Sequence, residues 1–274
     1  MRTRLLISAL ALGVGLLTPP AAEAKEIWLS TSAVATLGGL TFPADDVVEY
    51  DDVTDTSTLL FDGANFSASE NVNALDILDA QNILLSTGSD ATLGGLSFRD
   101  GDIVQYNLLT DTATLFFDED LFSADNDVDG VSLLPNGNIV LSTVVDATLG
   151  GLTFRDGDLV EYNPVLDTAT LFLDEDLFTG STDIDAVSVL PNGDIVLSTT
   201  QTVTLGGLSF RNGDLARYDP VLDTATLFFS EDLFSADEDI KAVFAPEPTT
   251  ASLLGLGLAG LGILRRPRDR AAKA

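Results

Sequence analysis

The chain contains no cysteine and no histidine among its 274 residues. Without cysteine it has no disulfide bonds, thiol nucleophiles or thiolate metal sites. Without histidine it lacks the general base of serine hydrolases and the imidazole ligands of most zinc hydrolases. It also has no phosphate-binding glycine loop, because the recurrent "LGGL" belongs to a repeat and does not join a strand to a helix. These absences exclude most familiar enzyme designs.

Basic residues are scarce. Residues 25–248 contain 41 acidic and six basic residues, which gives a formal net charge of −35. Such a body repels phosphate groups, so nucleic acid and anionic lipid are excluded as partners. Two interpretations of the charge stay open, namely solubility in salt and the binding of divalent cations.

The first 24 residues have the features of a signal peptide. Arg2 and Arg4 precede an apolar run from Leu5 to Leu17, and small residues follow at Ala22 and Ala24. This order is typical of a secretory leader that is removed after export. We therefore expect residues 1–24 to be cleaved and the mature chain to begin at Lys25.

The last 29 residues, 246–274, differ from the body in composition. Residues 248–264 form an uncharged run of 17 residues, which would make a helix about 25 Å long, at the short end of a membrane span. The basic residues that follow are Arg265, Arg266, Arg268 and Arg270. Because basic flanks stay cytoplasmic, this pattern places the body outside the inner membrane.

The tail also resembles a known sorting signal. Pro246, Glu247 and Pro248, the Gly/Leu-rich helix and the arginine cluster stand in the order found in PEP-CTERM proteins. The resemblance implies a Gram-negative bacterium in which an exosortase, a membrane-embedded processing enzyme, recognises and removes the tail. The alternative is a permanent membrane anchor with a chance Pro-Glu-Pro sequence.

The region between the two ends is a fourfold repeat. A Gly-Gly pair begins at Gly38, Gly94, Gly150 and Gly206, at a constant step of 56 residues. Each copy contains about four strand signals. In the third copy these are "DAVSVL", "DIVLST", "LVEYN" and "TATLFL". Asn192–Gly193 predicts a tight hairpin turn with positive φ at both residues, and "ATLGGLTFRDGD" predicts a glycine-rich loop with an extended piece.

Four strands per repeat predict an all-β fold, a four-bladed β-propeller over residues 25–245. Ile27 matches the second strand of the other copies, whereas residues 239–245 match the first strand. Residues 25–248 number 224, which is four repeats of 56. We therefore expect the two terminal strands to pair and close the ring. The alternative is an open β-stack or a long β-solenoid, which would need distinct end caps.

The body of the chain resembles the acidic propeller-like repeats of uncharacterised secreted bacterial surface proteins. The repeat unit "ILLSTGSDATLGGLSFRDGDIVQYN", followed by "DxDxxSxLPNG", carries this likeness. It implies a propeller fold and a surface location, and no particular activity.

Repeated carboxylates near the predicted first strand support a Ca²⁺ hypothesis, because Ca²⁺ takes six to eight oxygen ligands. The candidate ligands are Asn71, Asp127, Asp129, Asp183, Asp185 and Asp239. If they lie at one rim of the ring, their oxygens converge near the axis. A second set, Asp46, Asp102, Asp158 and Asp214, is better explained by turns in which aspartate bonds nearby backbone. Arg99, Arg155 and Arg211 precede three of these aspartates by three residues, which predicts local ion pairs.

Together these features predict an exported, exosortase-sorted protein of the envelope, outer surface or extracellular matrix. Its propeller would act as a structural or binding module toward exopolysaccharide or another surface component, and its C-terminal helix would contact the membrane at least transiently. The alternative is a carbohydrate-active enzyme that uses carboxylates at the axis. The near-identity of the copies favours the non-enzyme, and Trp28 is interpreted as a residue of the core or the closing seam.

Overall fold

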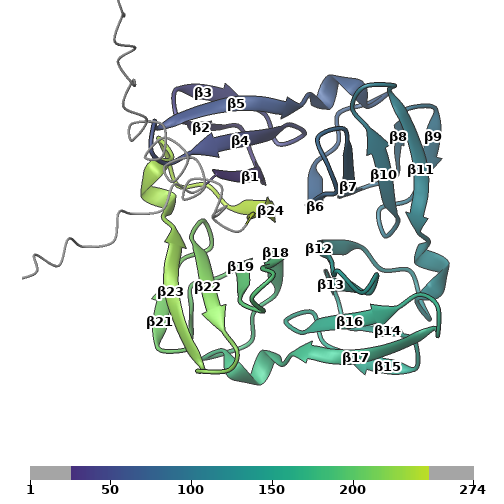
Figure 1. Cartoon of the computed structure of the whole chain (residues 1–274), viewed down its shortest axis with the longest axis vertical. Helices are drawn as coiled ribbons and strands as arrows, with labels where there is room; N and C mark the ends of the chain where they lie inside the picture. The colour runs from purple at the N-terminus through teal and green to yellow at the C-terminus, as the bar shows by residue number, and fades with distance from the viewer. Residues whose placement is uncertain (1–25, 247–274) are drawn as a thin grey trace, which may run out of the picture.

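The computed structural model describes residues 26–246, in which four four-stranded β-sheets are arranged around a central axis (Figure 1). The innermost strands are β24 (Ile240–Phe244), β6 (Val72–Ile77), β12 (Val128–Leu133) and β18 (Ile184–Val189). The second strands are β1 (Glu26–Thr31), β7 (Asn82–Thr87), β13 (Ile139–Thr143) and β19 (Ile195–Thr199). The predicted all-β, four-bladed propeller is therefore confirmed.

Two further antiparallel strands complete each blade. The third strands are β4 (Val47–Asp51), β10 (Ile103–Asn107), β16 (Leu159–Asn163) and β22 (Leu215–Asp219). The outer strands are β5 (Thr56–Phe61), β11 (Thr112–Phe117), β17 (Thr168–Leu173) and β23 (Thr224–Phe229). After each outer strand comes one 3₁₀ turn: η1 (Gly63–Asn65), η2 (Glu119–Leu121), η3 (Glu175–Leu177) or η4 (Glu231–Leu233).

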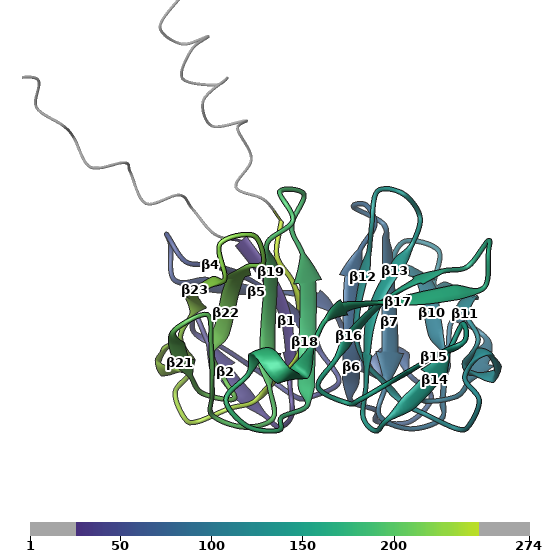
Figure 2. The same cartoon turned by 90° about the horizontal axis from the view of Figure 1, so that it is seen from below.

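The ring closes through its terminal strands. β24 pairs antiparallel with β1, with Trp28 opposite Phe244 and Leu29 opposite Val243. The first blade is thus built from both ends of the described chain, in the order β24-β1-β4-β5. This closure, with β24 beside β1 in Figure 1, excludes the open stack and the solenoid and removes two exposed strand edges. Figure 2 shows the same ring turned by 90°.

Apolar side chains between neighbouring blades form the core. The second strand is buried on both faces, as in Ile139–Thr143, because an interior strand of a packed sheet has no exposed side. Between the first blade and the blade that precedes β24 in the chain, Tyr50 of β4 meets Phe229 of β23 edge-on at 5.9 Å between ring centroids. Serine hydroxyls add polar links between blades: Ser198 Oγ in β19 donates to the Ile240 carbonyl oxygen in β24 at 3.1 Å. Each link of this kind contributes about 1 kcal/mol.

Two turn predictions are corrected by the structure. At the Asn192–Gly193 turn only Gly193 has positive φ, at 92°, and the Leu190 carbonyl accepts from the Gly193 N–H. This is a three-residue loop, a type I turn followed by a glycine bulge, because Pro191 favours negative φ at the first turn position. The tight turn with positive φ at both residues lies instead at Gly150 (54°) and Gly151 (82°).

The predicted glycine-rich loop is consequently a small β-hairpin in every copy. The four hairpins are β2 (Ala35–Leu37) with β3 (Leu40–Phe42), β8 (Ala91–Leu93) with β9 (Leu96–Phe98), β14 (Ala147–Leu149) with β15 (Leu152–Phe154), and β20 (Val203–Leu205) with β21 (Leu208–Phe210). A Cβ on Gly150 would lie 2.5 Å from the Ala169 nitrogen, so this glycine is required for close approach of the hairpin to β17 as well as for its turn.

The predicted signal peptide and most of the predicted sorting tail, including Glu247, Pro248, the hydrophobic run and the arginine cluster, lie outside the described residues. Among residues 26–246 the structure has no helix long and apolar enough to cross a membrane.

Candidate functional site

A β-bulge at the start of each inner strand places one side chain toward the axis. In β12 the pairing with β13 runs from Val128 opposite Thr143 to Gly130 opposite Ser142, so Asp129 is the extra residue. The same register shift occurs in β6, β18 and β24. An extra residue in a strand re-aims its side chain. We call the four residues at this position the axial residues: Asn73, Asp129, Asp185 and Lys241.

The axial residues bond to one another across blade boundaries. Asn73 Nδ2 donates to Asp129 Oδ1 at 3.4 Å, and Lys241 Nζ lies 2.5 Å from Asp185 Oδ1. Asp129 and Asp185 are only 2% and 1% exposed, so both carboxylates are shielded from bulk solvent. Two hydrogen-bond donors therefore face two acceptors at a position where identical repeats would place four copies of one residue.

A third carboxylate, that of Asp183, joins this cluster. Oxygens of Asp129, Asp183 and Asp185 all lie within 4.8 Å of one another. Asp183 Oδ1 is buried and has no hydrogen-bond partner in the described part of the chain. Burial, followed by the charges of Asp129 and Asp185, raises the pKa of Asp183. Burial alone would lower the pKa of Lys241, but the neighbouring carboxylates of Asp185, Asp129 and Asp183 together more than offset it, so that pKa is raised.

The other predicted ligands lie elsewhere. Asn71 is exposed, and its backbone carbonyl accepts from the Gly88 N–H. Asp239 accepts from the Asn212 side-chain amide. Burial raises the pKa of Asp127, and the charges of Asp100 and Asp125 raise it further. Of the six residues predicted to bind Ca²⁺, the structure thus brings three together, and these share the axis with Lys241.

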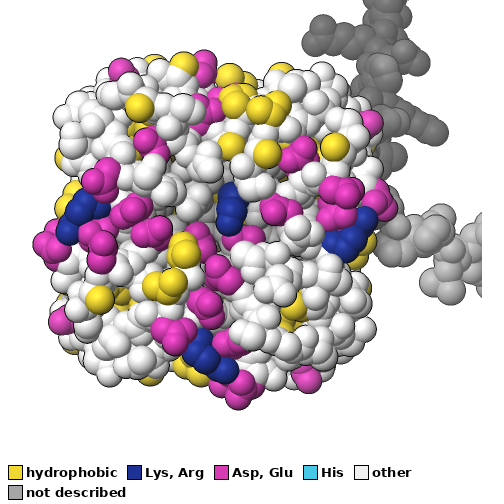
Figure 3. All heavy atoms as spheres, turned by 180° about the vertical axis from the view of Figure 1, so that it is seen from behind, with side chains coloured by type: hydrophobic (Ala, Val, Ile, Leu, Met, Phe, Trp, Pro, Cys, Tyr) yellow, Lys and Arg dark blue, Asp and Glu magenta, His cyan; other side chains and the backbone are white. Residues whose placement is uncertain are grey.

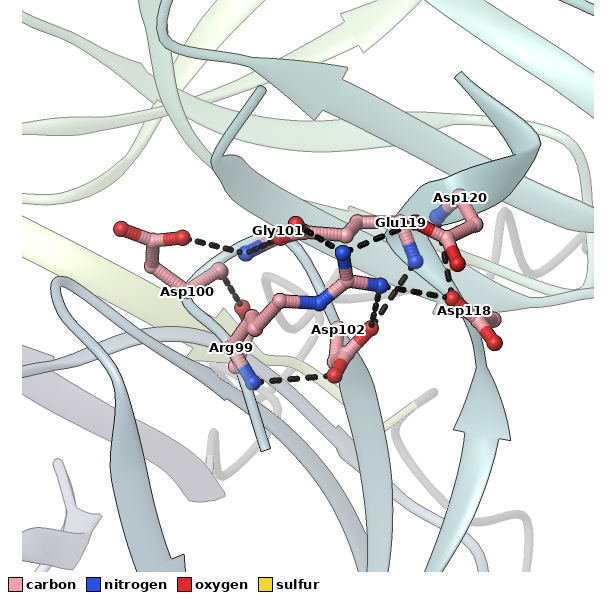
Figure 4. Close-up of polar contacts among 8 residues, drawn as sticks. Arg99, Asp100, Gly101, Asp102, Asp118, Glu119 and Asp120 are labelled. Carbon is pink, nitrogen blue, oxygen red and sulfur yellow. Dashed lines mark hydrogen bonds and ion pairs between the residues drawn. The ribbon is translucent and has the colours of Figure 1, made fainter. Parts of the chain in front are cut away.

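A second kind of charged cluster recurs once in each of several blades, around an arginine. We call each of these a rim cluster, and its place in the blade a rim. Figure 4 shows the Arg99 guanidinium among four carboxylates. Its Nη1 lies 2.8 Å from both Glu119 and Asp120, and its Nη2 lies 2.9 Å from Asp118 and 3.8 Å from Asp102. The predicted local pair with Asp102 is therefore present. The partners 19 to 21 residues away were not predicted from the sequence. They lie beside Arg99 because the antiparallel pairing of β10 with β11 returns the chain to this position.

Equivalent rim clusters form around Arg155 and Arg211. Arg155 Nη2 lies 2.6 Å from Asp174, and Arg211 Nη1 lies 2.7 Å from Glu231. The turn aspartates are structural, as predicted: Asp102 accepts from the Arg99 N–H at 2.9 Å and from the Glu119 N–H at 2.9 Å. On the face in Figure 3, basic side chains lie at the margins and near the centre, each beside acidic ones.

The first copy builds its rim differently. Pro43 stands where the other copies have arginine, and Gly63 stands where they have Glu119, Glu175 and Glu231. In exchange, Asp45 replaces the glycine at positions 101, 157 and 213. A Cβ on Gly63 would lie 2.4 Å from Asp45 Cβ, and one on Gly101 would lie 2.8 Å from Glu119 Cβ. In every copy one carboxylate side chain thus fills this space. In the first copy it comes from Asp45, before the third strand, and in the other copies it comes from the glutamate in the 3₁₀ turn after the outer strand.

The opposite end of the axis carries hydrogen bonds between blades. Asp76 Oδ2 accepts from the Leu133 N–H at 2.5 Å, Ser132 Oγ from Val189 at 3.0 Å, and Ser188 Oγ from Ala245 at 3.1 Å. The fourth position is Phe244, which cannot accept; its ring lies 5.5 Å from that of Trp28. Trp28 therefore belongs to the closing seam. Burial raises the pKa of Asp76 to about 6, against backbone hydrogen bonds from Leu133 and Ile77.

Comparison with known proteins gives only distant similarity. No family model matches the chain, and no curated protein matches it. The extracellular domain of the putative one component system BT4673 from B. thetaiotaomicron is 12% identical, with a TM-score of 0.35 over 76% of this chain and 33% of that one. A structure of a nidogen/laminin complex is 7% identical, with a TM-score of 0.39 over 81% and 98% of the two chains. A protein of unknown function from Bacteroides caccae is 10% identical, with a TM-score of 0.36 over 81% and 98%.

This chain spans about a third of the length of the BT4673 domain. The fold assignment therefore rests on the strand pairing described above.

Proposed function

We propose that this protein is an exported, exosortase-sorted component of the envelope or extracellular matrix of a Gram-negative bacterium. Its propeller would serve as a structural or binding module, with exopolysaccharide or another surface component as partner. The observation that carries the proposal is the junction between body and tail. The closing strand β24 ends at Phe244, and the Pro-Glu-Pro motif begins two residues later at Pro246.

That junction makes the tail dispensable for the fold. Within residues 26–246 the last residue with a registered strand partner is Phe244, opposite Trp28, so cleavage beyond Pro246 leaves every described strand and blade in place. A permanent anchor would not need the motif at this place. The processing enzyme is the partner of the tail, and the helix would contact the membrane only until cleavage.

The chemistry of the body favours a module over an enzyme. Glycoside hydrolysis requires two carboxyl groups about 5 to 9.5 Å apart with a sugar bond between them. At the axis one of the carboxylates, that of Asp185, is paired to the Lys241 ammonium. With Asp129 and Asp185 at 2% and 1% exposure, a sugar ring has no room to reach them.

The test is processing of the full chain in a Gram-negative host, with and without an exosortase-type enzyme. An epitope inserted at Val221, which is 89% exposed in the β22–β23 turn, marks the body without disturbing a strand. We expect the tagged protein outside the cell and, by mass spectrometry, shortened near residue 248 only when the enzyme is present.

The matched control is the double variant Pro246→Ala/Pro248→Ala, which should stay full-length and membrane-bound with the same folded body. A tagged protein that is soluble in the cytoplasm contradicts export. Identical shortening in a host without the enzyme contradicts the sorting mechanism.

A further inference from the structure

The axis gathers more carboxyl groups than its hydrogen-bond donors can satisfy when all of them are ionised. Three carboxylates, those of Asp129, Asp183 and Asp185, meet within 4.8 Å, and Asn73 supplies only a neutral amide. Burying several like charges together is costly unless a cation is held among them. In a metalloprotein a divalent ion would meet this need.

The cation present at this place is Lys241. Its ammonium lies 2.5 Å from Asp185, and the charges of Asp129 and Asp183 also act on it. The arginines within residues 26–246 are engaged elsewhere, Arg99, Arg155 and Arg211 at the rim and Arg217 with Asp194 at 2.6 Å. Lys241 is thus the one basic side chain that the described residues supply to the axis.

The position of Lys241 in the fold ties this charge to ring closure. It is the bulge residue of β24, the strand that completes the first blade. Docking of β24 against β1 therefore delivers the ammonium to carboxylates held by β12 and β18.

We propose that Lys241 is a built-in cation that takes the place of a metal ion at the axis, so that closure of the ring neutralises its own axial carboxylates. The consequence is that the native protein needs no divalent ion there. A chain without the ammonium should acquire a need for one. This inference is independent of the sorting proposal, because its test concerns only the folded body.

The experiment compares the purified exported protein with its Lys241→Asn variant, in which the fourth axial residue becomes the same as Asn73. Thermal melts are recorded in NaCl, MgCl₂ and CaCl₂ at equal ionic strength, and Ca²⁺ binding is measured by equilibrium dialysis. For the native chain we expect equal melting midpoints in all three salts. We also expect the amount of Ca²⁺ bound by the native chain to be the same with and without the substitution Asp129→Asn.

For Lys241→Asn we expect a midpoint lower by roughly 5 to 15 °C in NaCl, because a buried ion pair has lost its cation. Ca²⁺ should restore most of that shift, with one ion bound per chain, since an ion that binds only the native state raises the midpoint. Adding Asp129→Asn to Lys241→Asn should abolish the Ca²⁺ effect, which a merely structural role for Lys241 would not predict.

Two results overturn the proposal. One is a Ca²⁺-selective rise in the native chain that Asp129→Asn removes, since the axis would then already hold a metal. The other is a Lys241→Asn variant with no more Ca²⁺ binding than the native chain. If that variant does not fold in NaCl, refolding is scored in each salt, and recovery in Ca²⁺ alone supports the proposal whereas recovery in none contradicts it.

Discussion

The rim clusters and the axis of this propeller both combine acidic and basic side chains, but they arrange them in different ways. Three of the four rims repeat one arginine with nearly the same acids, from Arg99 with Glu119 to Arg211 with Glu231, and only in the last does a serine, Ser230, replace one aspartate. At the axis the four equivalent positions hold Asn73, Asp129, Asp185 and Lys241. A rim cluster is closed within one repeat, so copying the repeat copies a balanced site. The axis is shared by all four copies, so copying an acid would place four like charges together.

The comparison teaches where a repeat protein can stay regular. Contacts inside a repeat tolerate exact duplication, whereas contacts on the symmetry axis require the copies to diverge until donors face acceptors. The first rim shows that divergence also happens locally, in matched pairs such as Asp45 with Gly63.

The largest effect is expected from removing the strand that serves the axis while every rim cluster is left intact. A chain that ends at Glu238 loses β24, with Lys241 and the buried Ile240 and Val243. We expect it to lose the single cooperative unfolding transition followed by circular dichroism. A chain that ends at Pro246 keeps β24 and should melt like the mature protein. Equal melting of both truncations would show that closure contributes little.

The second prediction concerns pH and the other end of the axis. Because burial raises the pKa of Asp76 from 3.8 to about 6, the folded state favours the protonated form. Its contribution to the free energy of unfolding is therefore complete below pH 3.8 and is lost as the pH rises through 6. The loss is at most about 3 kcal/mol for a shift of this size.

Asp76→Asn should remove that pH dependence, because an amide does not titrate. Urea unfolding between pH 4 and pH 7 measures the difference between the native and variant curves, which cancels contributions from other carboxylates. Parallel curves over this range would mean that Asp76 does not titrate there.

A third prediction tests the exchanged pair at the first rim. Gly63→Glu alone should lower the free energy of unfolding by about 1 to 3 kcal/mol, because the new Cβ would overlap Asp45. Adding Asp45→Gly should recover at least half of that loss, since Gly101 accommodates Glu119 in the same way. The control is Asp45→Gly alone, and denaturant unfolding of the three variants gives the coupling energy. Additive losses would argue against the exchange.

The smallest effect is expected at the regular rims. Arg99→Gln and Arg155→Gln should each cost about 1 kcal/mol, because the arginine side chains are 41% exposed and screened by water. The double variant should be additive within about 0.5 kcal/mol, since the two clusters share no partner. At the axis, Lys241→Asn combined with Asp185→Asn should cost less than the sum of the two single changes. Urea unfolding of both sets tests the contrast, and strong coupling between Arg99 and Arg155 would contradict it.

Much of the architecture could be predicted from sequence because it is periodic. The 56-residue step, the strand signals and the split of one blade between the two ends all follow from aligning the copies with one another. The turns were harder to predict. Asn192–Gly193 and Gly150–Gly151 are both turn sequences, but only the Gly-Gly pair has positive φ at both residues. Pro191 occupies the first turn position before Asn192 and favours negative φ there. From sequence, Gly150–Gly151 predicts only a loop, because the close approach of its hairpin to β17 is a tertiary contact.

The candidate site was predicted only in outline. Convergence of Asp129, Asp183 and Asp185 followed from the repeat, whereas Asp127 and Asp239, one step away in the same motif, contact other residues. Lys241 was visible as a departure from the repeat, and its role was not. The signal that could have found it is the set of four axial residues taken together, with one base among two acids and an amide.

The sequence by itself determined the number of blades and the strand that closes the ring, and it is the basis for predicting export from the two end segments. Those properties are carried by local patterns and by the spacing of copies. Only the tertiary structure decided which charges meet: Lys241 reaches Asp185 across 56 residues, and Arg99 reaches Asp120 across 21. A β-bulge adds one residue to a strand and so changes the direction of the side chains around it. Whether an acid faces water, the backbone of a neighbouring blade or the axis depends on that bulge, and no local sequence pattern predicts it.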